Sequence, residues 1–134
     1  MKPTINCITL PVDDLRQSFK FYRDGLGLLA DEPDESSDHV AFTLDGKLYL
    51  VILLRHEFRK FTELANQDNA AKGSSECIVS YFTSNKEEVD IILKNVEKAG
   101  GVSTGNAVER PWGYAGYFKD PDDHLWEIMW NPAL

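Results

Sequence analysis

The stretch YFKDPDDHLWEI at residues 117–128 decides the fold, because a similar stretch occurs earlier in the chain. It predicts a tight, Asp-rich turn that leads into a strand with one acidic residue, Glu127, inside an apolar run. The earlier stretch, FTLDGKLYLV at residues 42–51, has a comparable turn and strand but places Leu50 where the glutamate is expected. The chain therefore looks duplicated, with the acidic residue in the second copy only.

Outward from the earlier stretch, the first copy predicts one strand, one helix and three further strands. Leu15 and Phe19 begin an apolar series at helical spacing, and Asp13 or Asp14 can cap this helix by accepting from its first turn. Pro11 lacks a backbone donor and should therefore end the preceding strand. The predicted strands of this copy are residues 4–10, 28–30, 39–44 and 47–55.

The second copy repeats this order. Ser84 and Glu87 have the spacing of a capping box, in which a hydroxyl accepts from the first turn and the glutamate reaches back. The helix that follows has apolar residues on one face and ends at Gly100 and Gly101. The predicted strands of this copy are residues 77–82, 103–109, 113–119 and 124–131.

These patterns predict one α+β domain over residues 1–134, made of two tandem βαβββ modules at residues 1–55 and 76–134. Residues 56–75 form the predicted linker, in which Phe58, Phe61 and Leu64 indicate a short helix before a polar run. That polar run is either a plain tether or a lid over a binding cavity. Because each module leaves one face of its sheet uncovered, the two modules should pair.

Composition narrows the classes of partner. The chain has 134 residues and a net charge of -8, which disfavours nucleic acid and anionic membranes because both require a basic face. A small organic molecule or another protein fits better. No apolar run approaches the length of a membrane span and no signal-like segment follows Met1, so we expect a cytoplasmic protein. Cys7 and Cys77 are too few for a disulfide framework, and we expect them to be reduced and buried.

The chain resembles the vicinal oxygen chelate superfamily, which includes glyoxalase I, bleomycin and fosfomycin resistance proteins and extradiol dioxygenases. The stretches that carry the resemblance are VDDL at residues 12–15, FKFY at 19–22, GLGL at 25–28 and GYFKDPDDHLWE at 116–127. The resemblance implies a curved mixed sheet around a ligand cavity and a homodimer. It does not fix the reaction, because the superfamily spans isomerases, dioxygenases, transferases and drug-binding proteins.

Metal-using members of this family place ligands on four strands, typically histidine or glutamine on the first strand of each copy and glutamate on the last. The corresponding positions here are Cys7, Leu50, Cys77 or Ile78, and Glu127. One carboxylate is a poor cage for Mg²⁺, Mn²⁺ or Fe²⁺, so we predict no metal site and no cofactor. The alternative is a zinc site made of Cys7, Cys77 and Glu127.

Glu127 is the candidate catalytic residue. Strand alternation puts Leu125, Glu127 and Met129 on one face. The other face carries Trp126, Ile128 and Trp130 and should pack beneath a helix. A carboxylate held on the concave face would have its pKa raised by desolvation, and it could act as a general base or hydrogen-bond a ligand. The alternative is a structural role, in which Glu127 pairs with Arg110 or with tyrosine hydroxyls.

An aromatic stretch supplies further candidate ligand-binding residues. Trp112, Tyr114 and Tyr117 could form flat apolar walls, and Arg110 could bind a carboxylate or phosphate. Alternatively, these aromatic residues complete the core. The full set of candidate ligand-binding residues is Arg110, Trp112, Tyr114, Tyr117, Cys7 and Cys77.

The sequence thus favours a small-molecule binding protein without the family's full metal site. The alternative is a metal-dependent lyase or dioxygenase of glyoxalase type with an altered metal site. A scaffold domain without a ligand is a third possibility, favoured if the concave face is filled by its own side chains.

Overall fold

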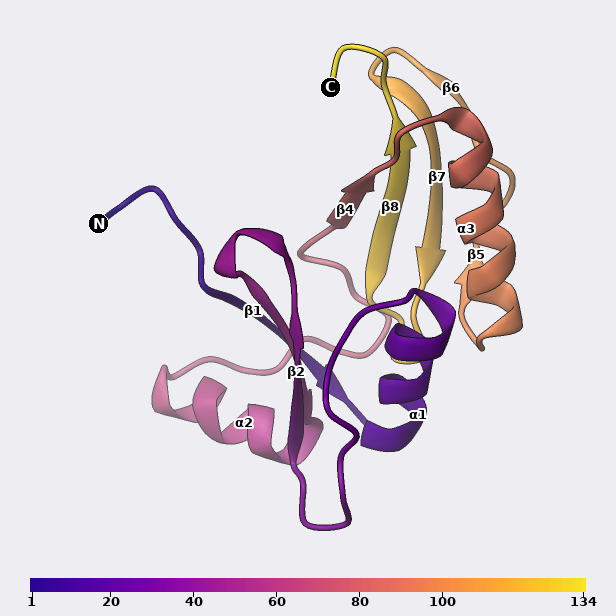
Figure 1. Ribbon diagram of the computed structural model, residues 1–134. Coiled ribbons are helices and arrows are strands. Elements are labelled where there is room, and N and C mark those ends of the chain that lie inside the picture. The colour runs from indigo at the N-terminus through magenta and orange to yellow at the C-terminus, as the bar shows by residue number, and fades with distance from the viewer. The chain divides into compact units, whose positions relative to one another are not determined.

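The chain forms two compact units, Met1–Ala71 and Lys72–Leu134, in a computed structural model that describes residues 1–134 (Figure 1). Each unit contains a mixed sheet with a helix packed on one face, so the predicted α+β class is confirmed. Both units have the strand order expected of a βαβββ module. None of the helices has the length and hydropathy needed to cross a membrane.

The first unit is a three-stranded sheet of order β1-β3-β2. Strand β1 (Cys7–Val12) runs parallel to β3 (Tyr49–Leu54), and β2 (His39–Thr43) runs antiparallel to β3. Helix α1 (Leu15–Lys20) continues as a short π-helix (Phe21–Gly25), and helix α2 (Arg55–Leu64) follows β3 directly. A 3₁₀ turn at Asp45–Lys47 joins β2 to β3.

Aromatic side chains hold α1 against this sheet. The Phe19 ring stacks on Phe42 of β2 with centroids 6.0 Å apart, and the Tyr22 ring lies 5.6 Å from the same ring. Asp14 caps the helix by accepting from the Gln17 backbone N–H at 2.9 Å, as one of the two predicted caps. The helix face of the first sheet is therefore a closed apolar core.

The second unit is a five-stranded sheet in which the order β4-β8-β7-β5 is extended by β6, which pairs with β7. Helix α3 (Lys86–Lys98) packs on one face. The Phe118 and Trp126 rings stack with centroids 5.7 Å apart. The strands are β4 (Val79–Phe82), β5 (Val102–Ser103), β6 (Val108–Arg110), β7 (Gly113–Lys119) and β8 (Leu125–Trp130).

A glycine lets α3 approach this sheet closely. A Cβ atom placed on Gly116 of β7 would lie 2.4 Å from Leu93 Cδ1 of α3 and 3.3 Å from Ala107 Cβ. Both distances are shorter than ordinary van der Waals contact. The helix therefore lies directly over the middle of β7.

The two units correspond residue by residue. The β2–β3 turn is closed by the pair Thr43↔Tyr49 and the β7–β8 turn by Lys119↔Leu125, and each pair encloses five residues. Tyr49 and Leu125 are 76 positions apart, so Glu127 corresponds to Val51. The predicted counterpart, Leu50, was therefore wrong by one residue. This matters because a slip of one residue in a strand moves the side chain to the opposite face. Leu50 is buried on the helix side.

Several predicted boundaries were also wrong. Strand β1 does not end before Pro11, which pairs with Leu53 inside the strand, because β1 lies at a sheet edge where a missing donor is tolerated. Helix α3 is capped by Asn85 instead of the predicted Ser84, and the Asn85 side chain accepts from the Glu88 backbone N–H at 2.9 Å. The strand predicted at residues 28–30 is a single bridge, Leu29↔Thr43, and that at 103–109 is divided into β5 and β6.

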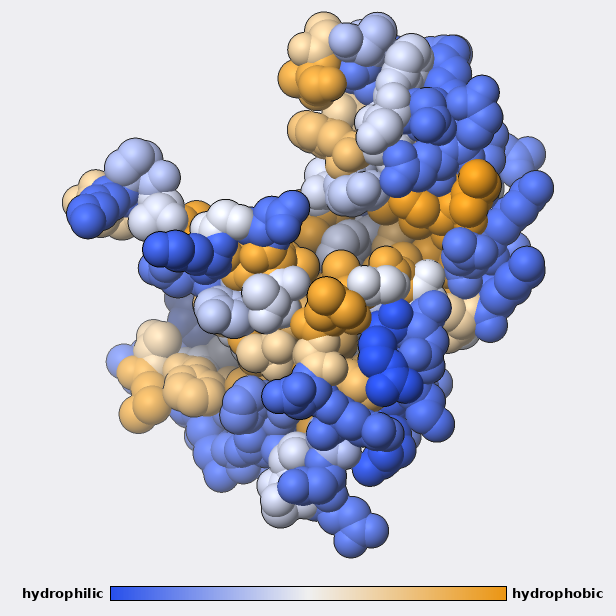
Figure 2. All heavy atoms as spheres, in the orientation of Figure 1, coloured by the Kyte–Doolittle hydropathy of each residue, from blue (hydrophilic) through white to orange (hydrophobic).

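The predicted linker contains the predicted short helix, α2, and the compact units divide at Ala71 and Lys72. None of the side chains of α2 is buried. Phe61 and Leu64 are 62% and 81% exposed, and Figure 2 shows apolar atoms at the surface over this helix. Helix α2 is therefore an amphipathic helix whose apolar side is only partly covered.

Candidate functional site

The second sheet has a polar group at the centre of the face that points away from α3. Glu127 lies in β8, between Ser80 of β4 and Tyr117 of β7, which are its direct cross-strand neighbours. The next residues along β8, Trp126 and Ile128, belong to the buried helix side. The predicted alternation of β8 is therefore confirmed.

Both oxygens of the Glu127 carboxylate accept hydrogen bonds. The Ser80 hydroxyl donates to Oε1 at 3.0 Å and the Tyr117 hydroxyl donates to Oε2 at 2.7 Å. Glu127 and Tyr117 are partly buried, whereas Ser80 is exposed. Donors on the two flanking strands thus fix the orientation of the carboxylate without any arginine or lysine.

The Glu127 carboxylate further favours the protonated form of Tyr117. Its pKa is raised above its usual value, mainly because it donates a hydrogen bond to the Glu127 carboxylate and secondarily because it is desolvated. The nearby Trp112 side chain and the positive charge of Arg110 lower the pKa of Tyr117 by smaller amounts. Of the predicted site residues, Glu127 and Tyr117 are therefore in direct contact, and Trp112 and Arg110 lie near enough to affect the pKa of Tyr117.

The backbone of the Trp112 loop is tied to the end of β8. The Asn131 side-chain amide donates to the Trp112 carbonyl at 2.8 Å. The Trp112 side chain remains 49% exposed, and Arg110 is exposed at the end of β6. An indole and a guanidinium near a fixed carboxylate can contact a ligand that has both an aromatic ring and polar groups.

Tyr114 does not join this group. It lies three residues before Tyr117 in β7, so the two side chains point to opposite faces of the sheet. The Tyr114 hydroxyl donates to Asp90 Oδ1 of α3 at 2.8 Å, and this bond raises the pKa of Tyr114 above its usual value. Strand alternation alone could have separated Tyr114 from the other candidates.

Sequence reasoning missed two residues on the Glu127 face, Ser80 and Phe82. Both alternate along β4 with Val79 and Tyr81, which pair with the helix-facing residues Trp126 and Ile128. Phe82 is 51% exposed and pairs with Met129 of β8. Their face depends on the parallel register between β4 and β8, which the sequence does not reveal. The only available signal was the period of two within residues 77–82.

The prediction that both cysteines are buried was wrong. Cys7 is exposed in the edge strand β1 of the first unit, where its Sγ lies 3.3 Å from Thr9 Oγ1. Cys77 is exposed in the second unit, two residues before β4 begins. Both thiols are free, and each lies beside the end of a strand that has one unpaired edge.

The family's metal positions can be assigned with the observed register. They are Cys7, Val51, Glu127 and Ile78, since Ile78 continues the face of Ser80 one residue before β4. These side chains offer one thiol, one carboxylate and two aliphatic groups. No group of three or more His, Cys, Asp or Glu side chains could hold a metal ion. The pair Cys7 and Val51 of the first unit offers no oxygen ligand and the pair Ile78 and Glu127 of the second offers one carboxylate, whereas a hard divalent cation prefers several oxygen ligands.

The first unit has a groove on its corresponding face. It measures about 550 Å³ and lies between α2 and the side of the sheet that points away from α1. Its exposed surface is mostly apolar and comes from Val51, Leu53, Phe58 and Phe61, whereas Thr9, Asp38, His39 and Glu57 supply the polar part of the lining. Helix α2 thus covers part of the face on which Val51 replaces the glutamate.

One family model matches most of the chain. The model of the Glyoxalase/Bleomycin resistance protein/Dioxygenase superfamily matches residues 4–128. A glyoxalase-related enzyme from Fulvimarina pelagi is 26% identical, with a TM-score of 0.81, and the match covers 97% of this chain and 89% of that one. No curated protein sequence matches this chain.

Two further solved structures share the fold. Hypothetical protein SA1046 from S. aureus is 23% identical, with a TM-score of 0.79 and coverage of 98% of this chain and 95% of that one. A glyoxalase/bleomycin resistance protein/dioxygenase family enzyme from Burkholderia phytofirmans PsJN is 18% identical, with a TM-score of 0.77 and coverage of 93% and 96%.

Proposed function

Because the chain belongs to the Glyoxalase/Bleomycin resistance protein/Dioxygenase superfamily, we propose that it binds a small organic molecule on the Glu127 face without the family's full metal site. One observation carries this proposal: hydroxyl groups on both flanking strands hold the two oxygens of Glu127 in place. A carboxylate fixed in this way is preorganised to accept a hydrogen bond from a ligand.

The carboxylate has capacity left for that bond. An ionised carboxylate has about four lone-pair sites, and Ser80 and Tyr117 occupy one on each oxygen. A ligand hydroxyl or amine could therefore donate to Glu127 without displacing either neighbour. Exposed Phe82 and Trp112 supply apolar surface, and Arg110 supplies a positive charge for an acidic group on the ligand. Aromatic acids that carry a hydroxyl or N–H donor combine all of these features.

The donor set supports binding without a metal. The family positions other than Glu127 carry a thiol or an aliphatic side chain, and the Glu127 oxygens already have hydroxyl partners. The aliphatic side chains at these positions have no oxygen or nitrogen atom that could coordinate a divalent metal ion. The hydroxyl groups of Ser80 and Tyr117 instead stabilise the carboxylate directly.

A thermal-shift experiment tests the ligand class. The probes are 4-hydroxyphenylacetate and indole-3-carboxylate, and we expect at least one to raise the melting temperature of the wild-type protein. The increase should disappear in Trp112→Ala and in Glu127→Gln, because each change removes a contact. Tyr81→Ala is the matched control, since Tyr81 is an exposed aromatic residue on the helix side of the same sheet. An increase that survives in Trp112→Ala and Glu127→Gln would place binding elsewhere.

Elemental analysis tests the metal. Protein purified without chelator should contain far less than one equivalent of any transition metal, and Glu127→Gln should leave that content unchanged. Stoichiometric metal that is lost in Glu127→Gln would overturn the metal-free proposal. It would instead favour a metal-dependent lyase or dioxygenase.

A further inference from the structure

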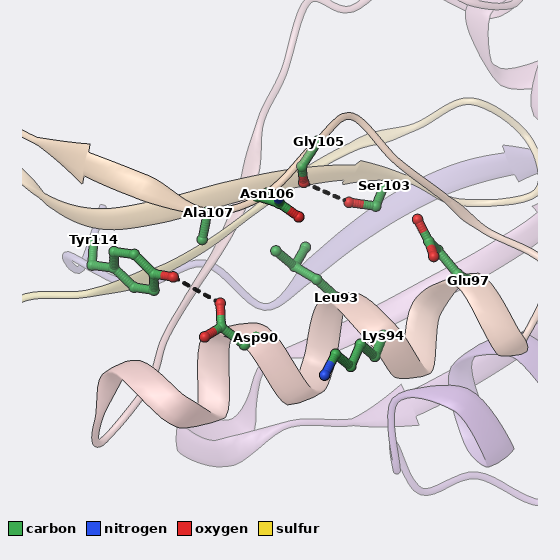
Figure 3. Close-up of a pocket in the computed structure, with 9 residues that line it drawn as sticks. All are labelled: Asp90, Leu93, Lys94, Glu97, Ser103, Gly105, Asn106, Ala107 and Tyr114. Carbon is green, nitrogen blue, oxygen red and sulfur yellow. Dashed lines mark hydrogen bonds between the residues drawn. The ribbon is translucent and has the colours of Figure 1, made fainter.

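A second groove lies on the opposite side of the second sheet from Glu127. It runs between α3 and residues 103–107, with Tyr114 of β7 at one end, and measures about 460 Å³ (Figure 3). Its base is apolar, because Leu93 and Ala107 are buried there. Since the sheet separates this groove from Glu127, any ligand here is independent of the function proposed above.

The two ends of the groove are held by hydrogen bonds. At one end the Tyr114 hydroxyl donates to Asp90 Oδ1 at 2.8 Å. At the other end the Ser103 hydroxyl donates to the Gly105 carbonyl at 2.8 Å, and Figure 3 shows the Glu97 carboxylate pointing toward this segment. These bonds fix the wall opposite α3 and the orientation of Asp90.

Three charged side chains line the groove without neutralising one another. Lys94 has Asp90 four residues before it and Glu97 three residues after it, spacings at which helix side chains commonly form ion pairs. Neither pair forms, and Lys94 and Glu97 have no ion-pair or hydrogen-bond partner at all. Asp90 is instead held by Tyr114. All three side chains are exposed, so the groove presents two negative charges and one positive charge to solvent.

We propose that this groove binds an α-amino acid with a basic side chain, of the chemical type of L-lysine. The net charge of the lining is -1 from Asp90, Lys94 and Glu97, and the net charge of such a ligand is +1. The ligand α-ammonium group contacts Glu97 and its α-carboxylate contacts Lys94. The ammonium group of the ligand side chain contacts Asp90 at the Tyr114 end.

The spacing along α3 fits this ligand. At a rise of about 1.5 Å per residue, Lys94 and Glu97 are about 4.5 Å apart along the helix axis, and Asp90 and Lys94 about 6 Å apart. The shorter separation suits the neighbouring ammonium and carboxylate groups of an α-amino acid. The longer one suits a chain of four methylenes, which would lie on Leu93 and Ala107.

An NMR titration of the full chain with L-lysine tests the site directly. We expect chemical-shift changes confined to residues 90–97, 103–107 and 114, with a dissociation constant of roughly 1 mM because the charge pairs are exposed to solvent. Two analogues separate the contacts: L-norleucine lacks the side-chain ammonium group and cadaverine lacks the carboxylate. Each should bind at least about threefold more weakly than L-lysine. No change in these residues at roughly 50 mM L-lysine would overturn the proposal.

Charge variants distinguish specific binding in the groove from simple attraction of a cation to an acidic surface. Asp90→Asn, Lys94→Gln and Glu97→Gln should each weaken L-lysine binding about threefold. Glu87→Gln is the matched control, because it removes the same charge from an exposed position of α3 outside the groove, and it should leave the affinity unchanged. Lys94→Gln should strengthen cadaverine binding while weakening L-lysine binding. If Lys94→Gln strengthens both, or if Glu87→Gln weakens L-lysine as much as Glu97→Gln does, the proposed site is wrong.

Discussion

The two units share one topology but differ on the sheet face that points away from the main helix. In the second unit this face presents Glu127 between Ser80 and Tyr117. The corresponding residues of the first unit are Val51, Thr9 and Ala41, which the register places in the same cross-strand positions. A hydroxyl is thus present beside the central strand in both units, whereas the carboxylate and the phenol occur only in the second.

This difference separates what the fold requires from what the site requires. Both helix faces are closed apolar cores, in which Leu50 and Ile52 of the first unit correspond to Trp126 and Ile128 of the second. The opposite faces are less constrained, because they do not pack against α1 or α3 and α2 covers only part of this face in the first unit. One face can therefore carry a polar group and the other an apolar groove on the same framework.

The largest effect is expected where the two cores differ most. Gly116 corresponds to Val40, which is buried in the first unit. Gly116→Val should lower the free energy of unfolding by about 3 kcal/mol, because even a Cβ would lie 2.4 Å from Leu93 Cδ1. Denaturant unfolding followed by circular dichroism measures the loss.

A second substitution shows whether Leu93 is the cause. Leu93→Ala alone should also destabilise, because it leaves a cavity under α3. The double variant Leu93→Ala/Gly116→Val should lose less free energy of unfolding than the sum of the losses in the two single variants. Strict additivity would mean that the new valine side chain does not clash with Leu93.

The next effect tests whether the polar group can be built in the first unit. Val51→Glu should cost about 1–2 kcal/mol, because the new carboxylate has only the Thr9 hydroxyl as a direct cross-strand donor. Adding Ala41→Tyr places a phenol where Tyr117 lies in the second unit, and should restore roughly half of that loss. A double-mutant cycle measures the coupling. Zero coupling would show that the register correspondence between Val51 and Glu127 does not extend to side-chain contacts.

A smaller effect concerns pH. The folded-state pKa of Tyr117 is raised above its usual value, chiefly by the bond to Glu127, so the phenol contributes stability that is complete below the unfolded-state pKa. That contribution is lost as the pH rises through the folded-state pKa. Tyr117→Phe should therefore cost about 0.5–1 kcal/mol at neutral pH and less at alkaline pH. Tyr114 and Tyr81 also have raised pKa values, so they contribute to the alkaline loss of stability as well. Tyr114→Phe and Tyr81→Phe measure these contributions separately in the same unfolding series.

Much of the fold was readable from the sequence because its signals are local. The period of apolar residues predicted α1 and α3, and the turns at Asp45 and Asp120 predicted both hairpins. Failures occurred where tertiary context, or the choice between two adjacent capping residues, decides the outcome. Pro11 remains inside a strand because β1 is an edge, and Asn85 caps α3 because its amide oxygen, one residue after Ser84, reaches the Glu88 N–H.

The candidate site was less readable because it depends on pairing between strands far apart in sequence. Strand alternation correctly placed Glu127 on the face opposite the helix, but Ser80 could be found only from the parallel register of β4 and β8. Leu50 was matched to Glu127 because both lie in apolar runs, and the observed register shifts this match to Val51. A register shift of one residue reverses every side chain, so sequence similarity alone could not resolve it.

The smallest effect is expected at the cysteine of the first face. Cys7 corresponds to Ile78, which is 53% exposed in the second unit, and Cys7 is itself exposed. Cys7→Ile should therefore change the free energy of unfolding by no more than about 0.5 kcal/mol, since neither side chain has a buried environment to lose. Thermal unfolding measures this change, and thiol labelling of the native wild-type protein should modify Cys7 without prior unfolding. A loss of several kcal/mol, or protection of Cys7 from the label, would show that this face is covered by apolar contacts and would remove the contrast with the buried helix faces.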